Sequence, residues 1–166
     1  MNFHRTILLA IAFAGAALSP AAFAQSATTT FDVTITIEST CSIDTPAATD
    51  VDFGSVDSTA TGIEAQGLLN VNCTPGTDYQ IALDAGSNDS GAGITGRAMA
   101  GGGELVPYQL YRDAARTQVW GETVDTDTVA GTGIGDVQEI PVYGLVPSAN
   151  FPAGSYVDTV TATVTY

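Results

Sequence analysis

Lysine is absent from this 166-residue chain, and its only histidine, His4, lies close to the N-terminus. Without a further histidine the chain offers no Ser-His or Cys-His pair for nucleophilic catalysis. Two cysteines without histidine also make a poor zinc site. A glycosidase needs only two carboxylates, but none of the 18 acidic residues stands out as a pair. We therefore expect no enzymatic activity, no metal site and no cofactor.

A long hydrophobic segment is also missing. The apolar run ILLAIAFAGAAL has 12 residues, whereas a transmembrane helix needs about 20. The basic stretch MNFHRT precedes this run, and SPAAFA follows it with a small-x-small cleavage site. These features predict a secretory signal peptide over residues 1–24, cleaved after Ala24, and export through the periplasm. Residues 25–166 are enough for one domain with a hydrophobic core.

Basic charge is scarce in the predicted mature chain. Removal of residues 1–24 leaves three arginines against 18 acidic residues, a net charge of −15. Such a surface repels phosphate backbones and anionic lipid headgroups. We therefore expect no nucleic-acid partner and no binding to a membrane surface.

The two cysteines, Cys41 and Cys73, remain in the exported chain. Because the compartment outside the cytoplasm is oxidising, we predict a disulfide between them. Closing a loop of about 33 residues would contribute roughly 3.5–4 kcal/mol in the chain-entropy description of a disulfide.

Helical periodicity is almost absent, and alternating apolar residues between Gly-, Pro-, Asn- and Asp-rich turns fill the chain instead. Short alternating segments with such turns predict an all-β sandwich or barrel. Pro107 indicates an edge strand or an early strand position. The residues predicted to share strand faces are Ile63, Ala65, Leu69, Val71 and Cys73; Tyr79, Ile81, Leu83 and Ala85; Val106, Tyr108 and Leu110; Ile140, Val142 and Gly144; and Val160, Ala162, Val164 and Tyr166.

The segment TTTFDVTITIEST, residues 28–40, has the strongest alternation, although it begins the mature chain. Its apolar residues are Phe31, Val33, Ile35 and Ile37. One interpretation is an ordinary first strand paired within its own sheet. The other is a strand for a neighbouring molecule, because a sandwich that ends on the strand YVDTVTATVTY would leave an unpaired edge. The link 38–40 spans only about 10 Å when extended, which favours donation to a neighbour.

Eight short motifs occur in an order that resembles the spore coat protein U domain family. They are CSI (41–43), DFG (52–54), VNC (71–73), YQIALDAG (79–86), RAM (97–99), YQLYRDAARTQVWG (108–121), PVYGLVP (141–147) and GSYVDTVTATVTY (154–166). The resemblance covers essentially the whole mature chain, and the best understood members of the family are subunits of archaic chaperone–usher pili.

This resemblance implies an incomplete immunoglobulin-like sandwich of six strands that lacks the seventh. Residues 25–37 would form an N-terminal donor strand, and residues 38–166 would form the pilin domain. A periplasmic chaperone would lend the missing strand, and an outer-membrane usher would exchange it for the donor strand of the next subunit. The carboxylate of Tyr166 would bind the chaperone. The expected function is a structural pilus subunit at the cell surface, in attachment and biofilm formation; the alternative is a non-polymeric secreted coat or binding module.

The remaining features have ordinary structural interpretations. We expect Trp120 to cover one end of the sandwich, and four tyrosines to lie in the core or on sheet faces. We interpret GTGIG (131–135) as a loop, because it lacks the spacing of a nucleotide-binding motif. The nearby acidic residues lack calcium-loop spacing and are expected to be solvated. The tyrosines are Tyr79, Tyr108, Tyr111 and Tyr143, and the acidic residues are Asp125, Asp127 and Asp136.

Overall fold

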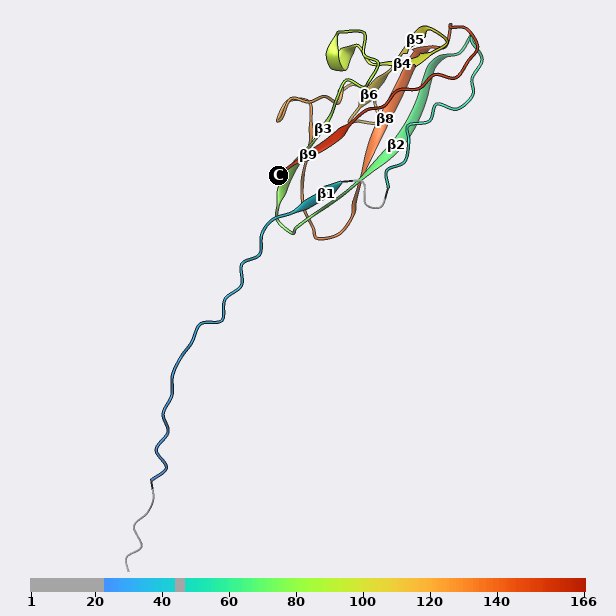
Figure 1. The fold of residues 1–166 in the computed structure, drawn as a ribbon. Helices are drawn as coiled ribbons and strands as arrows, with labels where there is room; N and C mark the ends of the chain where they lie inside the picture. The colour runs from blue at the N-terminus through green and yellow to red at the C-terminus, as the bar shows by residue number, and fades with distance from the viewer. Residues whose placement is uncertain (1–22, 44–46) are drawn as a thin grey trace, which may run out of the picture. The chain divides into compact units, whose positions relative to one another are not determined.

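The computed structural model describes residues 23–43 and 47–166, and the chain divides into two units between Thr36 and Ile37. The predicted signal peptide falls almost entirely outside the described residues. Among the described residues, the second unit holds nine strands and one short 3-10 turn (Figure 1). No helix in this part of the chain has the length and apolar character that crossing a membrane requires.

The strands form two principal sheets. Sheet one has the order β1-β2-β8-β6, from β1 (Cys41–Ile43), β2 (Thr61–Cys73), β8 (Gln138–Ser148) and β6 (Gln109–Tyr111). Sheet two has the order β7-β3-β9, from β7 (Val129–Thr132), β3 (Asp78–Leu83) and β9 (Ala162–Thr165). The hairpin of β4 (Ala98–Gly101) and β5 (Glu104–Pro107) is separate. Side chains from both sheets share one core, so the predicted all-β sandwich is confirmed.

The longest pairing joins β2 to β8, in antiparallel register from Thr61 opposite Ser148 to Val71 opposite Gln138. Alternate residues of both strands point into the core, as a strand buried on one face requires. Val71, Cys73, Val142 and Val146 are all at most 5% exposed. The faces predicted from the sequence for these two strands are confirmed.

The aromatic residues are structural, as predicted. Trp120 is fully buried, and its indole Nε1 donates a hydrogen bond of 2.8 Å to the carbonyl of Ile81. Tyr79 and Tyr108 are buried, whereas Tyr111 and Tyr143 are half-buried on β6 and β8. Burying the indole with its one donor satisfied lets Trp120 contribute its full apolar area to the core.

Two glycine-rich stretches contain strand residues. MAGGGE holds the turn between β4 and β5, in which Gly102 and Gly103 have positive φ angles of 59° and 87°. Two such residues in succession are what a tight type I′ hairpin turn requires. GTGIG begins inside β7, where a side chain at Gly131 would overlap the ring of Tyr79. The loop interpretation was therefore wrong at residues 131 and 132.

The predicted strand through Val106, Tyr108 and Leu110 is divided in two. Pro107 ends β5, which pairs only with β4 within the described residues, so its predicted edge position is confirmed. The amide of Tyr108 donates instead to the carbonyl of Arg97, and β6 then pairs with β8. A single stretch of alternating apolar residues therefore contributes strands to two different sheets.

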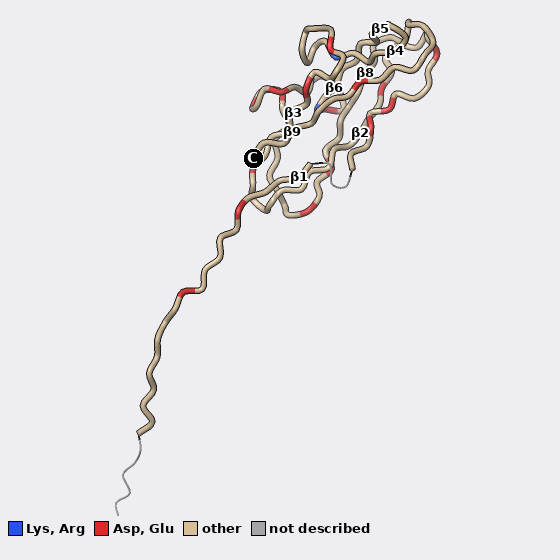
Figure 2. The backbone as a smooth tube through the Cα atoms, in the orientation of Figure 1, with Lys and Arg blue, Asp and Glu red and all other residues tan. Residues whose placement is uncertain are grey.

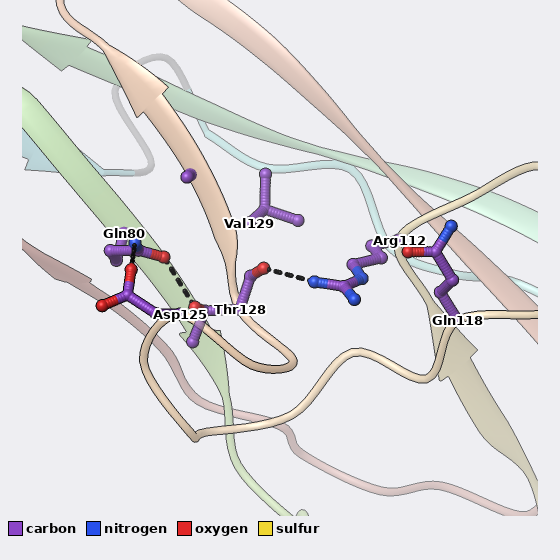
Figure 3. Close-up of a pocket in the computed structure, with 7 residues that line it drawn as sticks. Gln80, Arg112, Gln118, Asp125, Thr128 and Val129 are labelled. Carbon is purple, nitrogen blue, oxygen red and sulfur yellow. Dashed lines mark hydrogen bonds between the residues drawn. The ribbon is translucent and has the colours of Figure 1, made fainter.

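Acidic residues are spread over strands and loops, and few basic residues accompany them (Figure 2). The three acidic residues considered for calcium make separate hydrogen bonds. Asp125 accepts one from Gln80, Asp127 from the amide of Thr123, and Asp136 from the amide of Val137. Asp125 and Gln80 line a cavity beside β7, together with Arg112 (Figure 3).

Candidate functional site

The segment that follows the predicted cleavage site forms no strand. Residues 23–36 have no assigned secondary structure, and their apolar side chains are exposed. The exposed fractions are 83% for Phe31, 87% for Val33 and 84% for Ile35, and Ile37 at the start of the second unit is 78% exposed. Four large apolar side chains in alternation are costly to leave in water, which favours a partner that buries them.

Each principal sheet has a terminal strand, β1 in sheet one and β9 in sheet two, whose outer edge has no strand partner among the described residues. In the described chain β1 pairs only with β2, and β9 pairs only with β3. These two strands approach each other at one side of the sandwich without forming a ladder. Their inward residues, Ile43, Ala162 and Val164, pack against the core but are only half-buried. Unpaired backbone groups above a partly exposed apolar floor are suited to accept an added strand.

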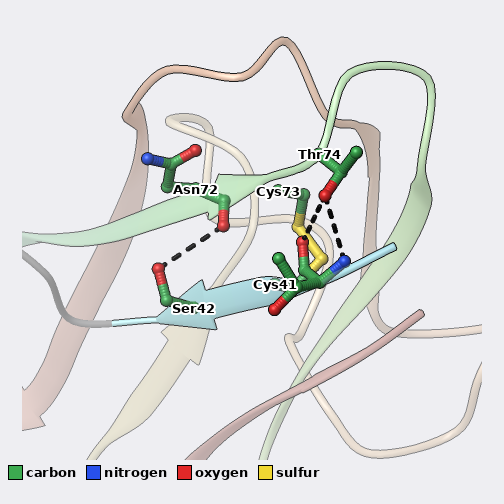
Figure 4. The surroundings of a disulfide bond; sticks show 6 residues. Cys41, Ser42, Asn72, Cys73 and Thr74 are labelled. Atoms are coloured by element: carbon green, nitrogen blue, oxygen red, sulfur yellow. Dashed lines mark hydrogen bonds between the residues drawn. A yellow bond between two sulfur atoms is a disulfide. The ribbon is translucent and has the colours of Figure 1, made fainter. Parts of the chain in front are cut away.

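The predicted disulfide is present at the start of β1. Cys41 and Cys73 are paired opposite each other in the β1–β2 ladder, with Cα atoms 4.1 Å apart (Figure 4). Beside it, the amide of Thr74 donates to the carbonyl of Thr40 at 2.9 Å, and the amide of Thr40 donates to Oγ1 of Thr74 at 3.0 Å. The disulfide and these bonds fix the point at which the N-terminal segment joins β1.

Two carboxylates hold the segment that leads into β9. The carboxylate of Asp158 accepts hydrogen bonds from the hydroxyl of Tyr108 at 2.6 Å, from the amides of Ser87 and Asn88, and from Nδ2 of Asn88. Asp84 accepts from the amides of Gly86 and Thr161, each at 2.9 Å. Where residues 84–88 pass residues 157–161, these contacts add to two backbone bonds, from the amide of Asp84 to the carbonyl of Thr161 and from the amide of Ser87 to that of Thr159. They position β9, and with it the free edge.

The hydrogen bonds to Asp158 and Asp84 shift the pKa values of Tyr108 and of Asp84 itself. Burial, followed by the hydrogen bond to Asp158, raises the pKa of Tyr108. Burial pushes the pKa of Asp84 upward, but the hydrogen bonds from Thr161 and Gly86 outweigh it and the pKa lies below its ordinary value. Hydrogen bonds to the charged form have this effect because protonation would weaken them.

A buried arginine ties the two sheets together. Arg97 is 1% exposed and donates to the carbonyls of Leu83, Asp84 and Trp120 and to Oε1 of Gln109. Burial lowers its pKa from the ordinary value. Its charge is stabilised by oriented carbonyl dipoles from the ends of β3 and from the Trp120 segment. No local sequence pattern indicates this role of Arg97, because its partners are mostly backbone atoms.

Tyr166 lies just beyond β9 and is 59% exposed. It lines an open cavity of about 600 Å³ on sheet two, together with residues of β3 and β7. The structure thus brings Cys41 and Cys73 together and places Tyr166 at the end of an edge strand. The predicted roles of the four apolar side chains in residues 31–37, and of the Tyr166 carboxylate, stay predictions.

Within the described residues, the fold defines a class: a disulfide-linked β-sandwich in which a terminal strand of each sheet, β1 or β9, has no partner on its outer edge. The Spore Coat Protein U domain model matches residues 27–163, and the chain belongs to this family. Protein U of Myxococcus xanthus is 34% identical over 181 aligned positions, which span 100% of each chain.

A solved structure has a similar fold. It is a pre-assembly complex of a chaperone and a tip adhesion subunit, CsuC–CsuE, from archaic chaperone–usher Csu pili of Acinetobacter baumannii. The match has a TM-score of 0.58 and 22% identity, and it covers 79% of this chain and 41% of that chain. At this identity the likeness establishes the fold.

Proposed function

We propose that this chain is a structural subunit of a chaperone–usher pilus, exported through the periplasm and displayed at the cell surface. Residues 25–37 of one subunit would pair with the free edges of β1 and β9 in the next. The pilus would serve surface attachment and biofilm formation. The observation that carries the proposal is the combination, within the described residues, of an exposed alternating segment with the free edges of β1 and β9, which approach each other at one side of the sandwich.

The energetics of such a joint are favourable. Burying Phe31, Val33, Ile35 and Ile37 would contribute about 1.5–3 kcal/mol each, or about 6–12 kcal/mol together, before the entropy cost of ordering the segment. Main-chain hydrogen bonds to β1 and β9 would add to this. A chain that both carries a donor segment and has free edges can repeat in a polymer.

The assembly partners follow from the same features. Until a neighbour arrives, the free edges would need a temporary strand, which a periplasmic chaperone supplies in this class of system. The exposed Tyr166 carboxylate at the end of β9 would be the chaperone's point of attachment. An outer-membrane usher would then exchange the chaperone strand for the donor segment. Nothing in this mechanism calls for a catalytic residue.

A second candidate is a non-polymeric secreted coat or binding module. It is favoured by the match to Protein U, which spans both chains in full and whose family is named for a spore coat. In that case residues 28–37 would pair within their own subunit. The two candidates therefore differ in whether the segment is inserted within the molecule or between molecules.

The experiment co-expresses the exported chain with its cognate chaperone and usher and compares Ile35→Asp with Thr34→Asp. Ile35 lies on the apolar face of the segment and Thr34 on the polar face, so only Ile35→Asp would bury an unpaired charge. We expect Ile35→Asp to abolish SDS-resistant multimers and Thr34→Asp to retain them. Deletion of residues 25–37 should remove multimers while chaperone binding persists. A stable monomer of the intact chain without chaperone would instead support the second candidate.

A further inference from the structure

An open cavity of about 440 Å³ lies between β7 and the loop that follows β6, the edge strands at the other ends of the two sheets being β6 and β7 (Figure 3). Its volume falls within the range of about 300–1,000 Å³ that is usual for small-ligand sites. Five polar side chains line it beside two residues of β7, namely Gln80, Arg112, Gln118, Asp125 and Thr128. No residue of β1 or β9 lines it, although Gln80, Asp125 and Ala130 also line the larger cavity beside Tyr166.

The side chains at one end of this cavity are held in fixed orientations. Nε2 of Gln80 donates to Oδ1 of Asp125 at 2.6 Å, and Oγ1 of Thr128 donates to Oε1 of Gln80 at 2.6 Å. Thr128 is buried. The side-chain amide of Gln80 is therefore oriented through both its nitrogen and its oxygen. One N–H of Nε2 and one lone pair of Oε1 are left for another partner. Side chains that are already ordered lower the entropy cost of binding.

Arg112 differs from the other two arginines of the domain. Arg97 donates five hydrogen bonds, and Arg116 pairs with Glu64 at 2.9 Å and donates to the carbonyl of Gly144. Arg112 makes one, from Nη1 to the carbonyl of Thr128 at 2.9 Å. Its Nε is buried without a partner among the described residues. A guanidinium has five N–H donors, so most of its binding capacity remains unused beside the cavity.

Asp125 has an unusual backbone. Its φ of 63° lies in the left-handed region, which aspartate adopts more readily than most residues with a side chain. The residue lies in a turn in which the amides of Thr126 and Asp127 donate to the carbonyl of Thr123. The Asp125 carboxylate lines the cavity wall, where one of its oxygens already accepts from Gln80.

The charges of the cavity and of the whole chain indicate which class of ligand the cavity can bind. One guanidinium and one carboxylate leave the lining without net charge, whereas the predicted mature chain carries −15 and repels polyanions. A lining of amide, hydroxyl and charged groups also disfavours an apolar ligand. Sugar hydroxyls both donate and accept, so they match Arg112, Gln118 and Asp125 together. We propose that this cavity binds a neutral, hydroxyl-rich saccharide, a role that does not depend on pilus assembly.

The test uses the purified, exported full chain and ligand-observed saturation-transfer NMR. Lactose, maltose and cellobiose are the neutral probes, and digalacturonate is the acidic probe. We expect at least one neutral disaccharide to bind with a Kd on the order of 1 mM, and digalacturonate to bind more weakly. Gln118→Ala should weaken binding about fivefold, the factor that one ordinary hydrogen bond contributes. Gln66→Ala, an exposed glutamine on β2 outside the cavity, should bind as the parent chain does.

Gln118 is exposed and its side chain makes no hydrogen bond within the described residues, so Gln118→Ala should fold normally. Arg112→Lys provides the second variant, because it keeps the charge but loses the planar donors. We expect it to lose affinity while near-ultraviolet circular dichroism stays unchanged. The proposal is overturned if none of the neutral disaccharides binds at millimolar concentration, if digalacturonate binds more tightly than they do, or if Gln118→Ala and Gln66→Ala bind equally well.

Discussion

Replacing Asp158 by alanine should destabilise the sandwich more than any other single change to its surface carboxylates. Asp158→Ala removes the acceptor for four donors and leaves the hydroxyl of Tyr108, itself 7% exposed, without a partner. A buried donor left unsatisfied costs about 1–3 kcal/mol. The other three donors are partly exposed, and two of them keep a second acceptor: the amide of Ser87 also donates to the carbonyl of Thr159, and Nδ2 of Asn88 to that of Val157. We therefore count about 0.5–1 kcal/mol for each. The expected loss is therefore about 2.5–6 kcal/mol.

The assay is urea denaturation of the purified mature protein at fixed subunit concentration, followed by fluorescence of Trp120, the only tryptophan. The midpoint should fall by about 1 M urea or more. Tyr108→Phe is the first control: it removes the donor together with its need for a partner, and should cost about 1 kcal/mol. Asp89→Ala is the second control. It should lower stability much less than Asp158→Ala, because in the described residues Asp89 accepts from the amides of Gly91 and Gly93 in its own loop. Equal losses for Asp158→Ala and Tyr108→Phe would refute the assignment of Asp158 as the anchor of the segment before β9.

Three further predictions concern the disulfide, acid stability and the C-terminus. Cys41→Ser should lower stability by about 3.5–4 kcal/mol and periplasmic yield with it; normal yield under oxidising conditions would contradict a structural disulfide. The contribution of Asp84 is complete above its unfolded-state pKa near 3.8 and is lost as the pH falls through its lower folded-state pKa. Asp84→Asn should therefore flatten the acid limb of the stability–pH curve, and an unchanged limb would show that other groups govern it. Adding Gly-Gly after Tyr166 displaces the terminal carboxylate by about 7 Å and should reduce co-purification of the chaperone, whereas unchanged recovery would place the attachment point elsewhere.

The regular strands of this fold could be predicted because their alternation is strong. β3 carries buried residues at every second position, as β8 does from Val142 to Val146, and in β2 the same alternation places Ile63, Ala65, Leu69, Val71 and Cys73 on one half-buried to buried face. β7 has the sequence VAGT, in which Gly131 and Ala130 have low strand propensity. It forms because β3 pairs with it and because Tyr79 packs against Gly131, both of which depend on distant residues.

The hydrogen bonds that support the candidate site could not be predicted from the sequence. Arg97 donates to backbone carbonyls from two separate parts of the chain and to the side chain of Gln109 from a third, and no local pattern encodes such an arrangement. Asp84 and Asp158 are two of 18 acidic residues, and only the fold distinguishes them from solvated ones. By contrast, the exposed alternating segment at 31–37 and the final strand were visible in the sequence, since both depend on local periodicity.

The most direct measurement of the central proposal places a photoreactive benzoylphenylalanine at position 35 and irradiates the assembled protein. The proposal predicts cross-links between subunits, with the modified peptide of one copy joined to β1 (Cys41–Ile43) or β9 (Ala162–Thr165) of another. The same group at position 34, on the opposite face of the segment, should give far fewer. Cross-links confined within single chains, or none to β1 or β9, would contradict donation of this segment to a neighbour.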